Sequence, residues 1–277
     1  NALPYKLDTK ISVFGRCQLD YFYVGYGSGG DVNAPYFVNV IDGIKNAGGH
    51  VNDWLLEYYK DFTKNNPAPH GFWGHWPMNF EEPSLDDKII ERASEESDVA
   101  LVVIGRAAGE DRENTLTKGS YYLTDEERTL LDNVCNHFSN VTVLLDCGNI
   151  IDMQWVLDYE ERLRGIIYAW QGGMESGNAI ADVLFGRVNP SGRLTDTVAV
   201  RYEDYPSAMH FGNKLFNTYV EDIFVGYRYF ETFSKEKALF PFGYGLSYTN
   251  FDIEVLDFKS DTVSYTHLRA HETRGNL

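Results

Sequence analysis

The residues best suited to do chemistry lie in 101–114, LVVIGRAAGEDREN, where an apolar run gives way to charged side chains. Five charged residues fall within eight positions: Arg106, Glu110, Asp111, Arg112 and Glu113. Carboxyl and guanidinium groups at this density could exchange protons or hold one another in ion pairs. Without further information, the cluster is best interpreted as a charged loop in solvent.

A second stretch of interest, YFYVGYGSGGDVN at 21–33, is rich in glycine from Gly25 to Gly30 and follows the apolar ISVFGR. Glycines allow backbone N–H groups to approach a ligand closely. The lysine and hydroxyl of a phosphate-binding loop are absent, and the spacing differs from the dinucleotide-binding pattern. The sequence therefore favours a neutral polar ligand, held by Ser28 and backbone amides, over a phosphate.

The elements that must position these loops alternate along the chain. Short β-rich apolar runs predict buried strands at 11–15, 99–105, 141–148 and 165–170. Amphipathic patterns predict helices at 36–47, 85–97, 124–138 and 175–185. Within the third helix, Thr124 and Glu127 are expected to form a capping box.

This alternation predicts an α/β fold, a mostly parallel sheet sandwiched by helices. Ligand sites in such sheets gather at the carboxyl ends of the strands, where both loops described above are expected to lie. From about residue 187 onward the rhythm is lost, and turns, aromatics and glycines predict a loop-rich C-terminal wrap with short strands.

The composition of the 277 residues disfavours several classes of partner. Acidic residues number 41 against 24 basic ones, and the net charge of −17 is unsuited to nucleic acid or to an anionic membrane. No run approaches the roughly 20 apolar residues of a membrane-spanning helix. Three widely spaced cysteines predict free thiols and favour a reducing, cytoplasmic compartment, although localisation stays open: Cys17, Cys135 and Cys147.

Seven segments, in order along residues 1–256, resemble one known family. They are GYGSGGDVN with the following VIDGIKNAG, GRAAGEDREN, YYLTDEERTLL, VTVLLDCGNIIDMQWV, GIIYAWQGGMESGNAIADVLFGRVNPSGRLTDT, EDIFVGYRYFETF and FPFGYGLSYTNFDIEV. Together they resemble the C-terminal-type α/β sandwich domain of glycoside hydrolase family 3, the β-glucosidase family. Residues 257–277 are interpreted as a linker with a non-native tail.

The resemblance implies a retaining glycosidase, which needs two carboxyl groups roughly 5 Å apart across the anomeric carbon. In this family the sandwich carries the acid/base glutamate in a Gly-Glu motif, which Gly109 and Glu110 match. Many members read Gly-Glu-Gly with a later Asp-Arg, so Glu113 is a second candidate. Closure by another domain and the neighbouring acids Asp111 and Glu113 are expected to raise the pKa of Glu110.

The same resemblance implies a substrate-binding set made of Gly27, Ser28, Gly29 and Arg106. Ser28 matches a serine that reaches a sugar hydroxyl, with a plain turn residue as the alternative. Arg106 is expected to orient Glu110 or its loop, and a structural ion pair explains it equally well. Two histidines and two tryptophans form an aromatic loop that we expect to pack on a neighbouring domain or line a leaving-group subsite, without a metal: His70, Trp73, His75 and Trp76.

The family's nucleophile aspartate lies on a (β/α)8 barrel of ~250 residues, which cannot fit beside the sandwich. Asp53 is rejected as the nucleophile because it lies early in the sandwich. We therefore expect a fragment that is inert alone, with the barrel in cis in a longer protein. Most family members have the barrel first, whereas AGEDREN and NIIDMQWV resemble more the subset that has the sandwich first, and the domain order stays open. The implied substrate is a β-glucoside or oligosaccharide, with no cofactor. β-Xylosidase and β-N-acetylglucosaminidase activities stay open, and a non-catalytic carbohydrate-binding or interaction module is the alternative.

Overall fold

The computed structural model describes residues 2–27, 30, 32–69, 71–72, 75–110, 114–159, 161–250 and 254. Its centre is a five-stranded sheet in the order β2-β1-β3-β4-β5, and every neighbouring pair is parallel. The strands are β1 (Lys10–Phe14), β2 (His50–Val51), β3 (Val99–Arg106), β4 (Val141–Cys147) and β5 (Leu163–Tyr168). The predicted parallel α/β fold is confirmed, and the short edge strand β2 is an addition to it.

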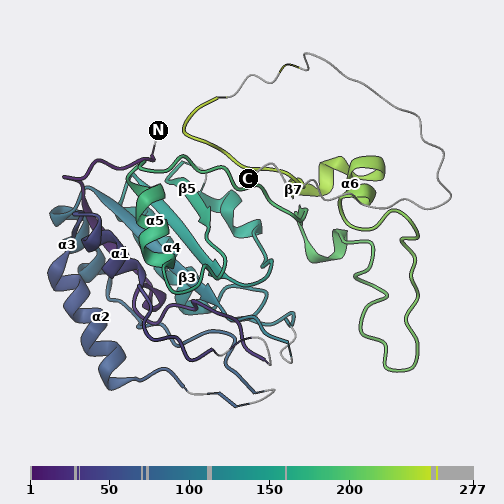
Figure 1. The fold of residues 1–277 in the computed structure, drawn as a ribbon, viewed down its shortest axis with the longest axis horizontal. Helices are drawn as coiled ribbons and strands as arrows, with labels where there is room; N and C mark the ends of the chain where they lie inside the picture. The colour runs from purple at the N-terminus through teal and green to yellow at the C-terminus, as the bar shows by residue number, and fades with distance from the viewer. Residues whose placement is uncertain are drawn as a thin grey trace.

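The helices cover both faces of this sheet (Figure 1). They are α1 (Val40–Asn46), α2 (Asp53–Asn65), α3 (Asp87–Glu96), α4 (Asp125–His137) and α5 (Ser176–Leu184). Alternate residues of β3 point to opposite sides: Ala100, Val102 and Ile104 pack with α3 and α4. Leu101 and Val103 pack instead with α1 and α5. All eight residues of β3 are buried, which is why the first seven form an uninterrupted apolar run; the eighth is Arg106.

Local signals explain where several helices begin. Thr124 and Glu127 form the predicted capping box of α4. The predicted helix at 36–47 begins only at Val40, because Asn39 caps it by accepting a hydrogen bond from the Asp42 N–H. Helix α2 was not predicted, and it begins after Asn52, whose side chain accepts from the Leu55 N–H.

Helices α1 and α5 touch backbone to backbone. A Cβ on Gly43 of α1 would come within 1.9 Å of the Gly177 carbonyl oxygen, and a Cβ on Gly177 within 1.9 Å of the Asn39 carbonyl oxygen. Only glycine fits at both positions, so this face of the sheet is covered by two helices at very short range. The glycines in VIDGIKNAG and GMESGNAIAD therefore have a packing reason.

The C-terminal part is rich in loops, as predicted. It contains the antiparallel pair β6 (Val198–Ala199) and β7 (Ala238–Phe240) and the helix α6 (Tyr227–Phe233). Short 3₁₀ turns complete the chain: Arg16–Gln18, Gln154–Tyr159, Tyr202–Asp204 and Lys235–Lys237. The segment between residues 205 and 226 reaches away from the sheet rather than wrapping it (Figure 1). Among the described residues no helix is long and apolar enough to cross a bilayer.

Candidate active site

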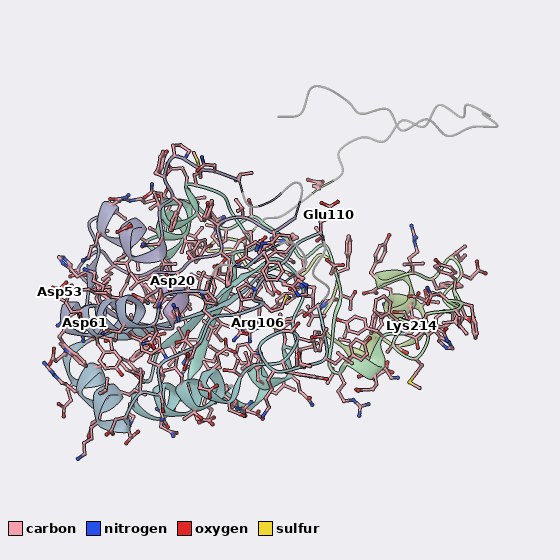
Figure 2. The ribbon with its side chains drawn as sticks, turned by 90° about the horizontal axis from the view of Figure 1, so that it is seen from below. Asp20, Asp53, Asp61, Arg106, Glu110 and Lys214 are labelled. Carbon is pink, nitrogen blue, oxygen red and sulfur yellow. The ribbon has the colours of Figure 1, made fainter. Side chains whose placement is uncertain are left out.

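Glu110 lies at the carboxyl edge of the sheet, four residues after the end of β3. Its side chain is exposed, and Figure 2 shows it at the margin of the molecule, whereas Arg106 lies inside. The backbone of Glu110 is tied down, because its N–H donates to the Tyr26 carbonyl at 3.1 Å. The Tyr26 N–H in turn donates to the Ala108 carbonyl at 2.7 Å, which makes a parallel bridge between Tyr26 and Gly109. The charged loop and the glycine-rich loop are thus joined at one edge.

Two glycines allow this close approach. Gly27 has a φ of +103°, and a Cβ there would lie 2.5 Å from the Glu110 Cβ and 2.9 Å from the Glu110 nitrogen. A Cβ on Gly109 would lie 2.7 Å from the Tyr26 Cβ. Real Cβ contacts do not occur at these distances, so the partner loop requires glycine at both 27 and 109, and the positive φ also favours it at 27. Gly27 therefore abuts the candidate acid/base residue directly.

Several predicted site residues cannot be placed. Ser28, Gly29, Asp111 and Glu113 lie outside the described residues, and so do His70 and Trp73 of the aromatic loop. Their proposed roles stay predictions. Within the described part of the chain, no group of three His, Cys, Asp or Glu residues is arranged to hold a metal ion.

Arg106 is fully buried and makes a two-pronged ion pair with Glu127. Its Nη1 and Nη2 donate to the two carboxylate oxygens at 2.6 and 2.5 Å. Three carbonyl oxygens accept its other hydrogen bonds, those of Gly105, Ser120 and Tyr122. Burial alone would lower the pKa of Arg106, but the Glu127 carboxylate more than reverses this effect and the pKa is raised.

This placement decides between the two interpretations of Arg106. A guanidinium with no exposed surface and protein partners throughout cannot touch a bound sugar in this conformation. The structure contains the ion pair, and through it and its hydrogen bonds Arg106 stabilises the end of β3 and the turn at 120–122. The prediction that Arg106 binds substrate is therefore corrected. Glu127 also accepts from the Thr124 N–H at 2.8 Å, so the same carboxylate caps α4.

The loop that follows β5 completes the edge. A Cβ on Gly25 would lie 3.2 Å from the Gln171 Oε1, and one on Gly148 would lie 2.8 Å from the same oxygen. Gln171 therefore reaches the base of the glycine-rich loop. Sequence reasoning missed it, although its position directly after the predicted strand at 165–170 was an available signal.

Two further acids have structural positions. Asp53 is the first residue of α2, and Figure 2 shows it at the left margin of the molecule, well apart from Glu110, which supports its rejection as a nucleophile. Glu175 precedes α5 and accepts from the Tyr36 hydroxyl at 2.6 Å and from the Asn178 side chain at 2.5 Å. These hydrogen bonds, that from Tyr36 first, lower the pKa of Glu175.

Comparison with known proteins gives a consistent answer. Residues 1–248 match the model of the glycosyl hydrolase family 3 C-terminal domain. The chain is 46% identical over 261 residues to a β-glucosidase of Ruminococcus albus, an alignment that covers 94% of this chain and 27% of that protein.

Solved structures agree in fold. A β-glucosidase of Paenibacillus barengoltzii superposes with a TM-score of 0.88 at 49% identity, over 90% of this chain and 27% of that one. β-Glucosidase 3B of Thermotoga neapolitana, solved in complex with glucose, gives a TM-score of 0.78 at 35% identity, over 90% of this chain and 36% of that one. The chain therefore spans about a quarter to a third of the length of these relatives.

Proposed function

The chain belongs to glycosyl hydrolase family 3, as its C-terminal domain, and from that premise we propose that it supplies the acid/base carboxylate, Glu110, of a retaining β-glucosidase. One observation carries the proposal. The loop after β3 presents the exposed Glu110 side chain at the carboxyl edge, while its backbone is hydrogen-bonded to the glycine-rich loop at Tyr26. A catalytic carboxyl group needs this combination of a fixed backbone and an accessible side chain.

The proposed chemistry has two steps. In the first, Glu110 in its acid form gives a proton to the glycosidic oxygen while a carboxylate nucleophile forms a bond to the anomeric carbon and the aglycone departs. In the second, the Glu110 carboxylate takes a proton from water, which attacks the same carbon and releases the sugar. A terminal, non-reducing β-D-glucosyl residue is the proposed substrate unit. Ser28, supported by Gly27 and Gly29, is proposed to bind a sugar hydroxyl, and Asp111 and Glu113 to lie close to the acid.

The nucleophile is proposed to come from a (β/α)8 barrel in cis. The relatives support this, because about two thirds to three quarters of their length lies beyond what this chain covers. A surface of this chain also supports a covering partner. Residues 209–246 expose many large apolar side chains, including Met209, Leu215, Tyr219 and Leu246, each more than 70% exposed. Soluble monomers rarely leave much apolar surface exposed, so this number of exposed apolar side chains supports a covering partner.

The experiment uses a chimera in which residues 1–250 of this chain replace the matching region of the Ruminococcus albus β-glucosidase. We expect the isolated chain to be inert on aryl β-glucosides and the chimera to be active. Glu110→Gln should lower kcat/KM for a glucoside with a poor leaving group by about 10²-fold or more. The kcat/KM for glucosides with good leaving groups reports the same first step and should fall much less, because their departure needs little protonation.

The matched control is Glu126→Gln, which neutralises another exposed acid, on α4. Its activity should equal that of the unaltered chimera. If Glu110→Gln lowers kcat/KM for both kinds of glucoside by the same factor, or lowers neither, Glu110 is excluded as the acid/base. Parallel assays with β-xyloside and β-N-acetylglucosaminide substrates identify the sugar. Tight glucose binding by the isolated chain would favour the alternative, a carbohydrate-binding module, since half of a split site should bind feebly.

A further inference from the structure

Trp76 stacks on Tyr26, the residue that holds the backbone of Glu110. The two rings lie 5.3 Å apart between centroids and 7° from parallel, and only 5% of Trp76 is exposed. We propose that Trp76 is a positioning residue for Glu110 and acts through Tyr26. The catalytic part of this inference rests on the proposed role of Glu110, whereas the structural part does not.

The connection from Trp76 to Glu110 through Tyr26 has two steps. The first is the ring stack, and the second is the pair of backbone hydrogen bonds by which Tyr26 binds Ala108 and Glu110. The same segment also supports the loop from its other end, since the Met78 carbonyl accepts from the Ala107 N–H at 2.7 Å. The backbone of residues 107–110 is thus held from two sides, by Tyr26 and by Met78. Trp76 lies two residues before Met78 in the chain and stacks on Tyr26.

The glycine-rich loop needs such an anchor. From Gly25 to Gly30 it contains four glycines besides Tyr26 and Ser28, so Tyr26 carries its only large side chain. Glycine-rich backbone has many accessible conformations, and a loop of this kind does not hold its shape unaided. Fixing the Tyr26 ring therefore fixes the carbonyl that accepts from Glu110.

Trp76 is itself held in place. A Cβ on Gly71 would lie 2.6 Å from both Cα and Cδ1 of Trp76, so the chain folds back closely over the tryptophan. The His75 N–H donates to the Phe72 carbonyl at 2.7 Å and closes this turn. Within the aromatic loop, Trp76 thus has a positioning role, which differs from the contact with a leaving group that the sequence suggested.

The first test uses the chain alone and measures hydrogen exchange of individual backbone amides. Trp76→Leu should speed exchange at the Tyr26 and Glu110 amides by about tenfold, with little change in α4. The matched control is Trp155→Leu, which removes an equally buried tryptophan, 3% exposed, from the core behind α4. Trp76→Phe should restore most of the protection.

The inference is overturned if Trp76→Leu and Trp155→Leu affect the two amides equally, or if neither does. Should Trp76→Leu not fold, Tyr26→Leu replaces it, because it removes the other ring of the stack and leaves the Trp76 loop intact. Protection of the Glu110 amide should then fall by the same factor. Unaltered protection in that variant also counts against the proposal.

The second test measures kcat/KM of the chimera on glucosides with poor and good leaving groups. A misplaced acid should hurt the poor leaving group selectively, so Trp76→Leu should widen the ratio by about tenfold or more. Trp155→Leu should lower both values together, as a purely structural loss would. Glu110→Gln is run beside them: if it leaves the ratio unaltered, the proposed function fails, and if it alone widens the ratio, the role of Trp76 fails.

Discussion

Replacing Glu82 with glutamine is expected to make the free energy of unfolding of the chain depend markedly less on pH. Glu82 is buried before α3, and its Oε1 accepts from the Arg16 N–H at 2.6 Å. Within the described part of the chain, its Oε2 is buried without a hydrogen-bond partner. Burial, aided by the Glu127 charge, raises the pKa of Glu82 from its ordinary 4.5 to about 8, although the Arg16 N–H and nearby guanidinium groups oppose the rise.

Whether stability rises or falls with pH depends on which state, folded or unfolded, holds the Glu82 proton. Between pH 4.5 and pH 8 the folded chain keeps the Glu82 proton and the unfolded chain releases it, so stability is lost as the pH rises. Each pH unit in this window is worth about 1.4 kcal/mol, which gives about 3 kcal/mol between pH 5 and pH 7. Glu82→Gln keeps the size and the acceptor for Arg16 but removes the titration. Its stability relative to the parent chain should therefore increase by about 3 kcal/mol over that interval.

Urea denaturation of the isolated chain, followed by circular dichroism across this pH range, measures the difference directly. Other titrating groups are common to both proteins and cancel in the comparison. Glu81→Gln is the matched control, because it alters the adjacent, exposed side chain and should give no such trend. A Glu82→Gln curve parallel to that of the parent chain would refute the reasoning, since it would mean that Glu82 is already ionised in the folded chain over this pH range, as it is in the unfolded chain.

Two further predictions follow from the site. Arg106→Met or Glu127→Gln should each lower the free energy of unfolding by about 3–5 kcal/mol, because a buried charge loses its partner, while denaturation of the double variant should show a smaller loss than the sum. Gly27→Ala should lower kcat/KM of the chimera by about tenfold or more, because its Cβ would displace Glu110. Gly48→Ala has a similar positive φ but no atom within 4 Å, so it should strain the backbone comparably and leave activity near that of the parent; equal activities in the two variants would contradict the steric argument.

The sheet could be predicted from the sequence because its signals are local. A strand buried on both faces must be apolar throughout, as 99–105 is, and a capping box needs only residues three apart, as Thr124 and Glu127 are. Helix α2 was harder to predict, although Leu55 and Tyr59 lie one helical turn apart on its buried face. Charged and aromatic residues are mixed along α2, so its amphipathic pattern is hard to distinguish from the surrounding loops.

The contacts that make the site are not local and could not be predicted in the same way. The sequence predicts that Arg106 can form an ion pair, but it does not identify the partner. Glu127 lies 21 positions away, and its sequence context predicts only a role in the capping box of the helix at 124–138. Tyr26 and Trp76 come from separate loops, and nothing in either loop specifies the other as its partner. The burial of Glu82 likewise depends on how segment 79–86 closes over Arg16, which no periodic pattern encodes.

Arg106 and Glu110, the two described residues of the charge cluster, point in different directions. Arg106, the last residue of the strand, turns into the core and is neutralised by Glu127, whereas Glu110 turns out to the margin. Between them, Tyr26 and Met78 hold the backbone of 107–110 from two sides. In the proposed function Glu110 meets a nucleophile carried by another domain, and this arrangement favours that role. Any freedom left in the loop would be lost as entropy in the transition state, so a loop that is fixed before the two domains meet lowers the barrier.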